Sequence, residues 1–77
     1  MVTHASVRRA LARAIRQQRT IAGMTQRQLA ARLRVTAIFI GRIERGQADI
    51  SAEAFVRLAR VLGIDPVKLL RKVVKGG

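Results

Sequence analysis

The sequence predicts an all-α domain built from five short helices. Apolar residues recur three and four positions apart along most of the chain, and no segment alternates apolar and polar residues over a useful length. Glycines just after three of the helical patterns mark helix ends. Four residues of the N-capping type mark helix beginnings: Thr25, Thr36, Ser51 and Asp65.

Length and composition limit the classes of protein that this chain can be. Its 77 residues suffice for one small domain with a single core. It has no cysteine, which excludes disulfides and thiolate-bound metals, and its one histidine, His4, is not expected to bind metal. Because no carboxylate pair, Cys–His pair or phosphate-cradling loop is present, we expect neither an enzyme nor a cofactor. No apolar run approaches the roughly 20 residues that span a membrane, which predicts a cytoplasmic protein without membrane contact.

The charge of the chain is strongly positive and unevenly distributed. Sixteen Lys and Arg stand against four Asp and Glu, for a net charge of +12. Residues 1–43 contain arginines and no acid, a distribution that attracts polyanions such as nucleic acid at long range. A merely solubilising surface is the alternative interpretation. With two Phe and no Tyr or Trp, binding of single strands by base stacking is not expected.

The first helix is predicted at residues 7–22, after a flexible arm at residues 1–6. Its apolar positions fall on one face and its arginines on the other. Gly23 suits the left-handed conformation just past a helix end. Residues 7–75 are expected to form one domain.

The four later helices share one pattern at their beginnings. Each N-capping residue follows an apolar residue and precedes another at the fourth helical position, which is the hydrophobic staple. Thr25 also has Gln28 three residues on, completing a capping box, and Pro66 occupies a first helical position, where its missing N–H costs nothing. These helices are predicted at residues 26–32, 37–45, 52–62 and 66–74. The predicted core consists of Leu11, Ile15, Leu29, Leu33, Ile40, Ile43, Phe55, Leu58, Leu62, Val67 and Leu70.

The third predicted helix has an outward face whose chemistry suits the reading of DNA. On a 100° helical wheel, Ile40 and Ile43 mark its buried side, which leaves Ile38 and Arg42 pointing outwards. Arg42 can donate two hydrogen bonds to guanine O6 and N7, and Ala37 and Ile38 can contact a thymine methyl. The rest of this face consists of Gly41 and Arg45, with Phe39 at its edge. The second helix begins with free N–H groups that suit a phosphate.

Two runs of the chain combine these features: RQQRTIAGMTQRQLAARLRVTAIFIGRIERG and AFVRLARVLGIDPVKLL. They resemble the lambda-repressor-like (Xre/Cro-like) family of helix-turn-helix regulators, most closely in GMTQRQLA, IERG and LARVLGIDP. The resemblance covers about residues 8–71 and implies a compact five-helix DNA-binding domain, with the helix-turn-helix unit at the second and third helices. It further implies a nucleoid-associated transcription regulator whose partner is double-stranded DNA.

The resemblance also implies roles for single residues. It implies that Arg19 pairs with Glu44, and the charge distribution agrees, because Glu44 is the only acid near the acid-free basic half. A solvated acid at a helix end is the alternative for Glu44. The residues expected to face base edges are Ala37, Ile38 and Arg42. The residues expected at the DNA backbone are Thr25, Gln26, Arg27, Arg34, Thr36, Phe39, Arg45 and Gln47.

The chain departs from the family where Ala37, Ile38 and Phe39 replace residues that are usually polar. Contact with thymine methyls and sugars, a protein–protein surface, and partly buried packing of Phe39 are all open interpretations. The loop at residues 47–49 is also less basic than in the family. The better phosphate candidates are therefore Arg27, Arg34 and Arg45.

A single recognition helix reads few base pairs, so we expect a homodimer on a palindromic site, with half-sites about 34 Å apart. The predicted dimer interface is Val67, Leu70, Val73 and Val74, because the last helix carries more apolar surface than the core needs. Within the same fold, an antitoxin that binds a toxin or another regulator as well as DNA is the main alternative. A restriction-modification controller and a nonspecific basic binder are others.

Overall fold

The computed structural model describes residues 4–76, and every regular element within that range is a helix. This confirms the predicted all-α, five-helix fold. The elements are α1 (His4–Ile21), α2 (Gln26–Leu33), α3 (Ala37–Glu44), α4 (Ala52–Leu62) and α5 (Pro66–Gly76).

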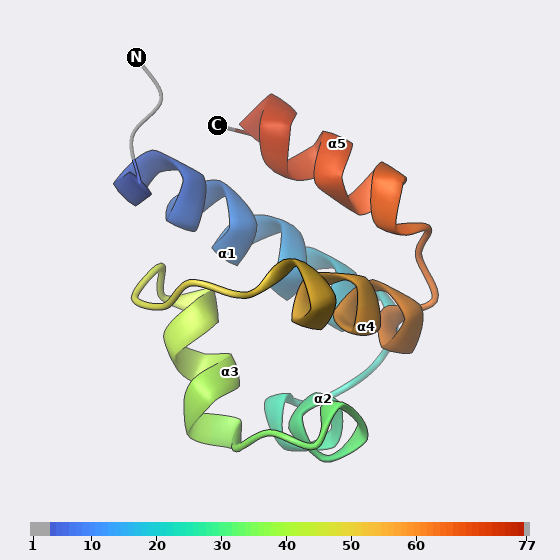
Figure 1. Cartoon of the computed structure of the whole chain (residues 1–77). Coiled ribbons are helices and arrows are strands. Elements are labelled where there is room, and N and C mark those ends of the chain that lie inside the picture. The colour runs from blue at the N-terminus through green and yellow to red at the C-terminus, as the bar shows by residue number, and fades with distance from the viewer. Residues whose placement is uncertain (1–3, 77) are drawn as a thin grey trace.

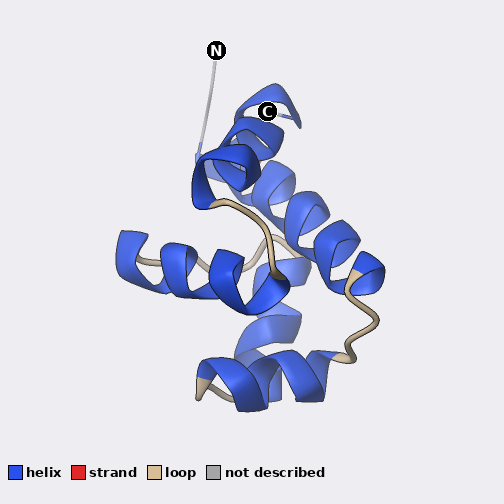
Figure 2. Cartoon of the chain, turned by 90° about the vertical axis from the view of Figure 1, so that its right-hand side faces the viewer, coloured by secondary structure: helices blue, strands red, loops and turns tan. Residues whose placement is uncertain are grey.

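Helix α1 is the element around which the others are arranged. It packs against α3 on one side and α5 on another, while α2 contacts α3 and α4. Figure 1 shows α5 lying along α1 at the end of the molecule opposite to α2, with α3 standing at one side. The view at 90° shows the short connections that join α2 to α3 and α4 to α5 (Figure 2). The pair α2–α3 therefore lies at one end of the molecule, supported by α1 and α4.

The core forms where the five helices face one another, and seven large side chains in it are fully buried: Ile15, Leu29, Leu33, Ile40, Ile43, Leu58 and Leu69. The predicted positions on α1 to α4 are all buried except Phe55, which is partly buried against the core.

The predicted register of α5 was wrong. Val67 and Leu70, expected in the core, are 57% and 51% exposed, while Leu69 and Val73 are buried. Both sets have helical spacing, because the chain carries Leu and Val in adjacent pairs at 69–70 and 73–74. The turn that enters α5 decides between them, and it rotates the helix so that Leu69 and Val73 face α1 and α4.

All four predicted N-caps are present. The Thr25 hydroxyl accepts a hydrogen bond from the backbone N–H of Gln28, whose side chain accepts one from the Thr25 N–H (3.0 and 2.9 Å), so the capping box is complete. The other three cap side chains also accept from backbone N–H groups of the following turn: Thr36, Ser51 and Asp65. Local side-chain chemistry thus fixes where these helices begin.

Helix ends differ by a few residues from the prediction. Residues 4–6, expected in a flexible arm, form the first turn of α1, and residues 1–3 of that arm lie outside the described residues. Helix α5 continues to Gly76 instead of ending at residue 74, and the Arg13 guanidinium donates a hydrogen bond to the Gly76 carbonyl (2.7 Å). A contact from α1 therefore supplies one of the partners that the last turn of α5 lacks.

Each of the first four helices is followed, within two residues, by a residue with positive φ, and in one case that residue is not glycine. Gly23, Gly46 and Gly63 have φ of 72° to 75°, and Arg34, which ends α2, has φ of 61°. The next N–H after Arg34, that of Val35, donates to the Ala30 carbonyl (3.0 Å), which closes the helix tightly. This backbone conformation costs an L-residue roughly 1–2 kcal/mol.

Substitution of Arg34 by glycine should raise the free energy of unfolding by about 0.5–1 kcal/mol, because relief of the left-handed strain exceeds the entropy that glycine adds to the unfolded chain. Arg34→Val should lower it, since a β-branched side chain fits this conformation worst. Chemical denaturation measures both. Equal destabilisation by the two variants would contradict the role given to backbone strain.

Candidate nucleic-acid interface

Helices α2 and α3 form a helix-turn-helix unit. A three-residue turn, Arg34 to Thr36, joins them, and Val35 in its centre packs against the core. The Thr36 hydroxyl caps α3 by accepting a hydrogen bond from the Phe39 N–H (3.1 Å). Buried side chains of α2 and α3 fix the two helices to each other, so the outward side of α3 is held rigidly.

The outward face of α3 presents apolar and cationic side chains together. Ile40 and Ile43 are 0% and 1% exposed, whereas Ile38 is 75% exposed and Arg42 is also exposed. Ala37 is partly buried. Phe39 is partly buried too and packs against the core, which favours the packing interpretation for its ring. The apolar reading surface is therefore smaller than the sequence indicates and depends mainly on Ile38.

Gly41 is buried, although it was expected on the outward face. The side chains of Arg45 and Gln26 cover it: a β-carbon added there would meet Arg45 Nη1 at 3.1 Å and Gln26 Oε1 at 3.7 Å. The helical wheel missed this because it considers one helix, and the covering groups come partly from α2. The tight contact is the one with Arg45, so Gly41 gives the Arg45 guanidinium room to lie against α3.

Beneath that glycine lies an ionic cluster centred on Glu44, whose side chain has no exposed surface. Arg19 donates two hydrogen bonds to the two carboxylate oxygens, from Nε (2.7 Å) and Nη2 (2.9 Å), and a third from Nη1 to the Met24 carbonyl (2.8 Å). Gln26 Nε2 donates to Glu44 Oε1 at 3.1 Å, and Arg16 Nε lies 3.7 Å from the same oxygen. One carboxylate thereby joins α1, α2 and α3.

The surroundings of Glu44 keep it ionised. Burial by itself raises the pKa of this carboxyl, but the hydrogen bonds from Arg19 and Gln26 and the charges of Arg19 and Arg16 together hold the pKa below its usual value. The hydrogen bond to Glu44 in turn raises the pKa of Arg19. The solvated-acid alternative for Glu44 is therefore wrong.

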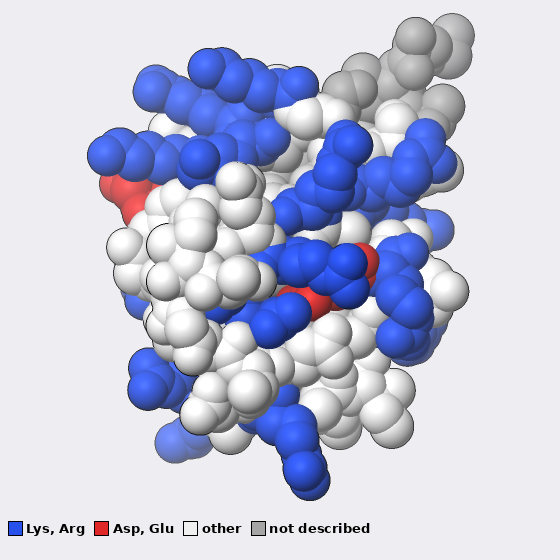
Figure 3. Space-filling model, turned by 180° about the vertical axis from the view of Figure 1, so that it is seen from behind, with Lys and Arg blue, Asp and Glu red and all other residues white. Residues whose placement is uncertain are grey.

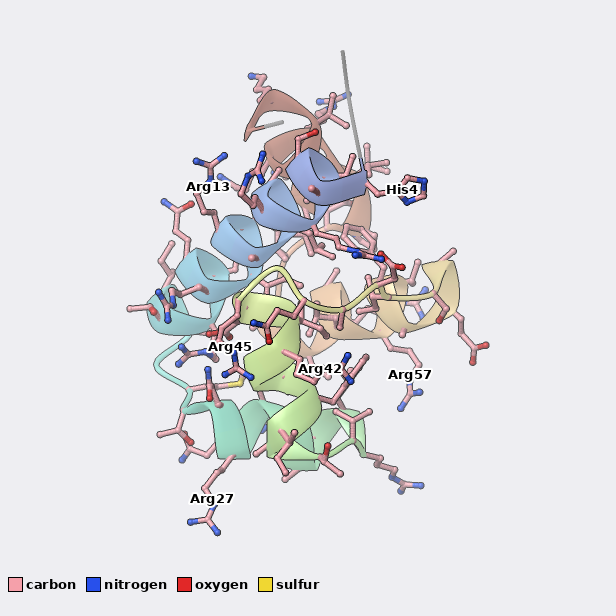
Figure 4. The ribbon with its side chains drawn as sticks, turned by 90° about the vertical axis from the view of Figure 1, so that its left-hand side faces the viewer. His4, Arg13, Arg27, Arg42, Arg45 and Arg57 are labelled. Carbon is pink, nitrogen blue, oxygen red and sulfur yellow. The ribbon has the colours of Figure 1, made fainter. Side chains whose placement is uncertain are left out.

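Arg42 and Arg45 share one partner at the carboxyl end of α3. Arg42 Nη2 donates to the Gln47 carbonyl and Arg45 Nε donates to the Gln47 side-chain oxygen, each at 3.3 Å. Figure 4 shows both arginines on the exposed side of α3. These long, exposed hydrogen bonds orient the two cations without neutralising them.

The other residues expected at the DNA backbone surround α3. Thr25 and Thr36 use their hydroxyls as caps, and Arg27 and Arg34 are exposed. In Figure 4, Arg27 extends from α2 on one side, and Arg57 extends from α4 near Arg42 on the other. Two glutamines were also expected at the DNA backbone: Gln26 is partly buried and Gln47 is exposed.

Arg57 is a residue of this face that the sequence interpretation missed. Its Nη2 donates to the Leu33 carbonyl at the end of α2 (2.9 Å), so α4 supports the helix-turn-helix turn and brings a cation to its edge. Nothing in its local spacing distinguishes Arg57 from other exposed arginines. Its place on this face follows only from the way α4 packs against α2 in the folded protein.

Positive charge is widespread on the surface, as Figure 3 shows for one side of the molecule. Among residues 4–76, no group of three or more His, Asp or Glu could hold a metal ion. No helix in that part of the chain is long and apolar enough to cross a membrane.

A helix-turn-helix family model, HTH_3, matches residues 15–69, which include the α2–α3 unit and the Glu44 cluster. The chain belongs to the lambda-repressor-like helix-turn-helix family. Its members are DNA-binding transcription regulators, so the chain is a DNA-binding regulator and not an enzyme. No curated protein sequence matches the chain significantly.

Solved structures of regulators have the same fold. The clp gene regulator ClgR from Corynebacterium glutamicum has a TM-score of 0.85 at 30% identity, over 91% of this chain and 90% of that chain. The restriction-modification controller protein C.AhdI from Aeromonas hydrophila has a TM-score of 0.76 at 31% identity, over 80% and 94%. The controller protein C.Esp1396I, solved as a tetramer with its natural 35 base-pair operator, has a TM-score of 0.80 at 21% identity, over 91% and 92%, which shows the fold alone.

Substitution of Glu44 by Gln should lower the free energy of unfolding at pH 7 by roughly 1.5–3 kcal/mol, because charged hydrogen bonds become neutral ones and Arg19 loses its counter-ion. Glu44→Ala should cost more. Because the folded-state pKa of Glu44 is lowered, its contribution is complete above the unfolded pKa of about 4.3 and is lost as the pH falls through the folded value.

Urea denaturation at a series of pH values tests this pair of expectations. The difference between the wild type and Glu44→Gln should be largest at neutral pH and should shrink in acid. A difference that stays constant down to pH 2 would show that the ionised carboxylate is not its cause.

Proposed function

We propose that this DNA-binding regulator is a sequence-specific transcription regulator that binds double-stranded DNA as a homodimer, with α3 in the major groove of each half-site. The observation that carries the proposal is the outward face of α3, where Ile38 and Arg42 are exposed on a helix whose opposite side is fixed in the core. An α-helix fits the major groove, where each base pair has its own pattern of donors and acceptors.

Arg42 is the residue proposed to read a base. It is the only cation within α3, in the last turn of that helix, and it is exposed. Its guanidinium suits guanine O6 and N7, and its bond to the Gln47 carbonyl is weak enough to be exchanged for them. Ile38 and Ala37 are proposed to contact thymine methyl groups, since neither has a polar side chain.

The backbone contacts proposed earlier surround that helix. Arg27 at the beginning of α2 and Arg45 at the end of α3 extend as charged side chains on the exposed face (Figure 4). Gln26 can present its amide at the DNA-facing edge while still donating to Glu44. Phosphate contacts of this kind fix register and orientation but carry no sequence information.

The homodimer is proposed to form through α5, with one change to the predicted interface. Val67, Leu70 and Val74 are 57%, 51% and 69% exposed, whereas Val73 is buried and belongs to the core. Beside Val67 and Leu70 opens an apolar groove of about 670 Å³ that Val7 and Phe55 also line. An exposed apolar ridge next to an apolar groove suits a two-fold interface, in which each copy offers both to the other.

Charge also favours that face. Two chains of net charge +12 repel each other, and three acids, Asp49, Glu53 and Asp65, belong to the loop and helix ends beside the groove, with Asp49 lining it. Asp49 accepts two hydrogen bonds from Arg8 (2.7 Å each), so the negative charge of Asp49 at the rim of the groove is paired with the positive charge of Arg8. The acids beside the groove offset part of the positive charge that exposed lysines and Arg71 bring to α5, which lowers the repulsion between two copies at this face.

Arg42→Ala should weaken binding to the preferred DNA site by roughly 1–3 kcal/mol and relax the base preference at one position of each half-site. Selection of binding sites from random duplexes identifies the site, and titration of wild type and variant measures the loss. Arg60→Ala on α4 is a control of equal charge change. An equal loss by Arg42→Ala on random DNA would make Arg42 a phosphate contact, and a failure of selection to enrich any sequence would contradict the proposed function.

Leu70→Glu should shift the protein from dimer to monomer without lowering the melting temperature of the monomer, because Leu70 is half exposed and lies on the proposed interface. Sedimentation velocity measures the change. Ile21→Glu makes the same chemical change at an apolar side chain 70% exposed on α1, and it should leave the dimer intact.

Dissociation by both variants, or by neither, would overturn the α5 interface. A wild-type protein that is monomeric alone, but forms a stoichiometric complex with a different protein through Leu70, would favour the antitoxin-like alternative.

A further inference from the structure

Helix α1 carries a row of arginines that neither the helix-turn-helix unit nor the proposed dimer uses. Arg9, Arg13 and Arg16 are spaced by four and three residues, so they share one helix face, and all three are exposed. Arg9 forms no hydrogen bond or ion pair with another described residue. Arg13 contacts only the Gly76 carbonyl, and Arg16 lies 3.7 Å from the Glu44 carboxylate with 65% of its side chain exposed.

This row borders the end of α3 from which Arg45 extends. The side chain of Arg9 lies against Gly46, directly after α3: a β-carbon added to that glycine would stand 3.7 Å from Arg9 Cγ. At its other end, Arg16 approaches Glu44, the last residue of α3. Figure 4 shows Arg13 on α1, Arg45 on α3 and Arg27 on α2 along the same side of the view. The cations therefore continue one edge of the proposed DNA-binding face beyond the helix-turn-helix unit.

We propose that Arg9, Arg13 and Arg16 bind phosphates of the DNA strand that borders the groove entered by α3. The chemistry of the partner follows from the residues, because guanidinium groups spaced along a helix, with no acid on α1, match a line of phosphates. Seven residues of helix extend about 10 Å, close to the axial rise of three nucleotides of one strand. The inference rests on the proposed function, since it places the row beside an α3 that is already in the groove.

A row that only solubilised the protein would behave like any other exposed cations, and the chain offers a matched pair for comparison. Arg60 and Lys68 are exposed near the ends of α4 and α5 that the connection between them joins. Figure 1 shows this connection on the side of the molecule opposite to α3. The double variants Arg9→Gln/Arg13→Gln and Arg60→Gln/Lys68→Gln lose the same charge. Arg16 is left unchanged because it touches the Glu44 cluster.

The test measures the affinity of the wild type and both variants for the selected duplex site as a function of salt. Each lost phosphate contact removes about 0.9 from the slope of log K against log salt, so the α1 variant should lose nearly two per bound subunit and nearly four for the dimer, which is on the order of a thousandfold in affinity at 0.1 M salt. It should still select the same sequence, because phosphates carry no base information. Arg9→Lys/Arg13→Lys should restore most of the slope, and the melting temperatures should match.

Equal slopes for the α1 variant and its control would overturn the α1 proposal and leave the reading by α3 untouched. Failure to enrich any sequence, together with a reduced slope for the α1 variant, would overturn the proposed function while supporting the α1 row as a DNA-backbone surface. The two failures are therefore distinguishable.

Discussion

The buried carboxylate of Glu44 is the interaction on which the proposed DNA-binding face depends. It lies at the end of α3, receives two hydrogen bonds from Arg19 on α1 and one from Gln26 on α2, and has no contact with solvent. Such a charge is strongly destabilising when left alone, so the three helices that supply its partners are held in one arrangement. Removal of any one partner would leave part of this buried charge uncompensated, so the carboxylate couples the positions of α1, α2 and α3.

The same cluster explains how a strongly basic surface is tolerated around α3. One internal acid offsets part of the repulsion between Arg16, Arg19 and their neighbours. The other acids lie in the loop before α4, in the first turn of α4 and directly before α5. Gly41 completes the arrangement, because its missing side chain leaves room for the Arg45 guanidinium beside Gln26, which donates to the carboxylate. The exposed arginines are thus left free to meet a polyanion, while the partly buried Arg19 is bound to Glu44.

Features determined by neighbouring residues were predictable from the sequence, and features determined by docking were not. The caps at Thr25 and Asp65 depend on the next turn only, so the helix beginnings followed from the residues themselves. In α5 two registers fit the pattern equally, and the contact with α1 and α4 chose the one that buries Leu69. One of the two side chains that cover Gly41 belongs to α2, and the hydrogen-bond partner of Arg57 on α4 also belongs to α2. Neither neighbour can be found from the residues of one helix alone.

The proposed mode of binding places an unusual demand on specificity. Each half-site gains one bidentate contact, worth roughly 1–3 kcal/mol of discrimination, whereas the many arginines strengthen binding to every sequence. Further phosphate contacts from α1 would raise affinity without raising the ratio of specific to nonspecific binding. Discrimination must then come from two copies that read together, because a dimer doubles the base contacts and adds a fixed spacing between half-sites. In the proposed mode of binding, the apolar face of α5 is for this reason as important to sequence recognition as Arg42 itself.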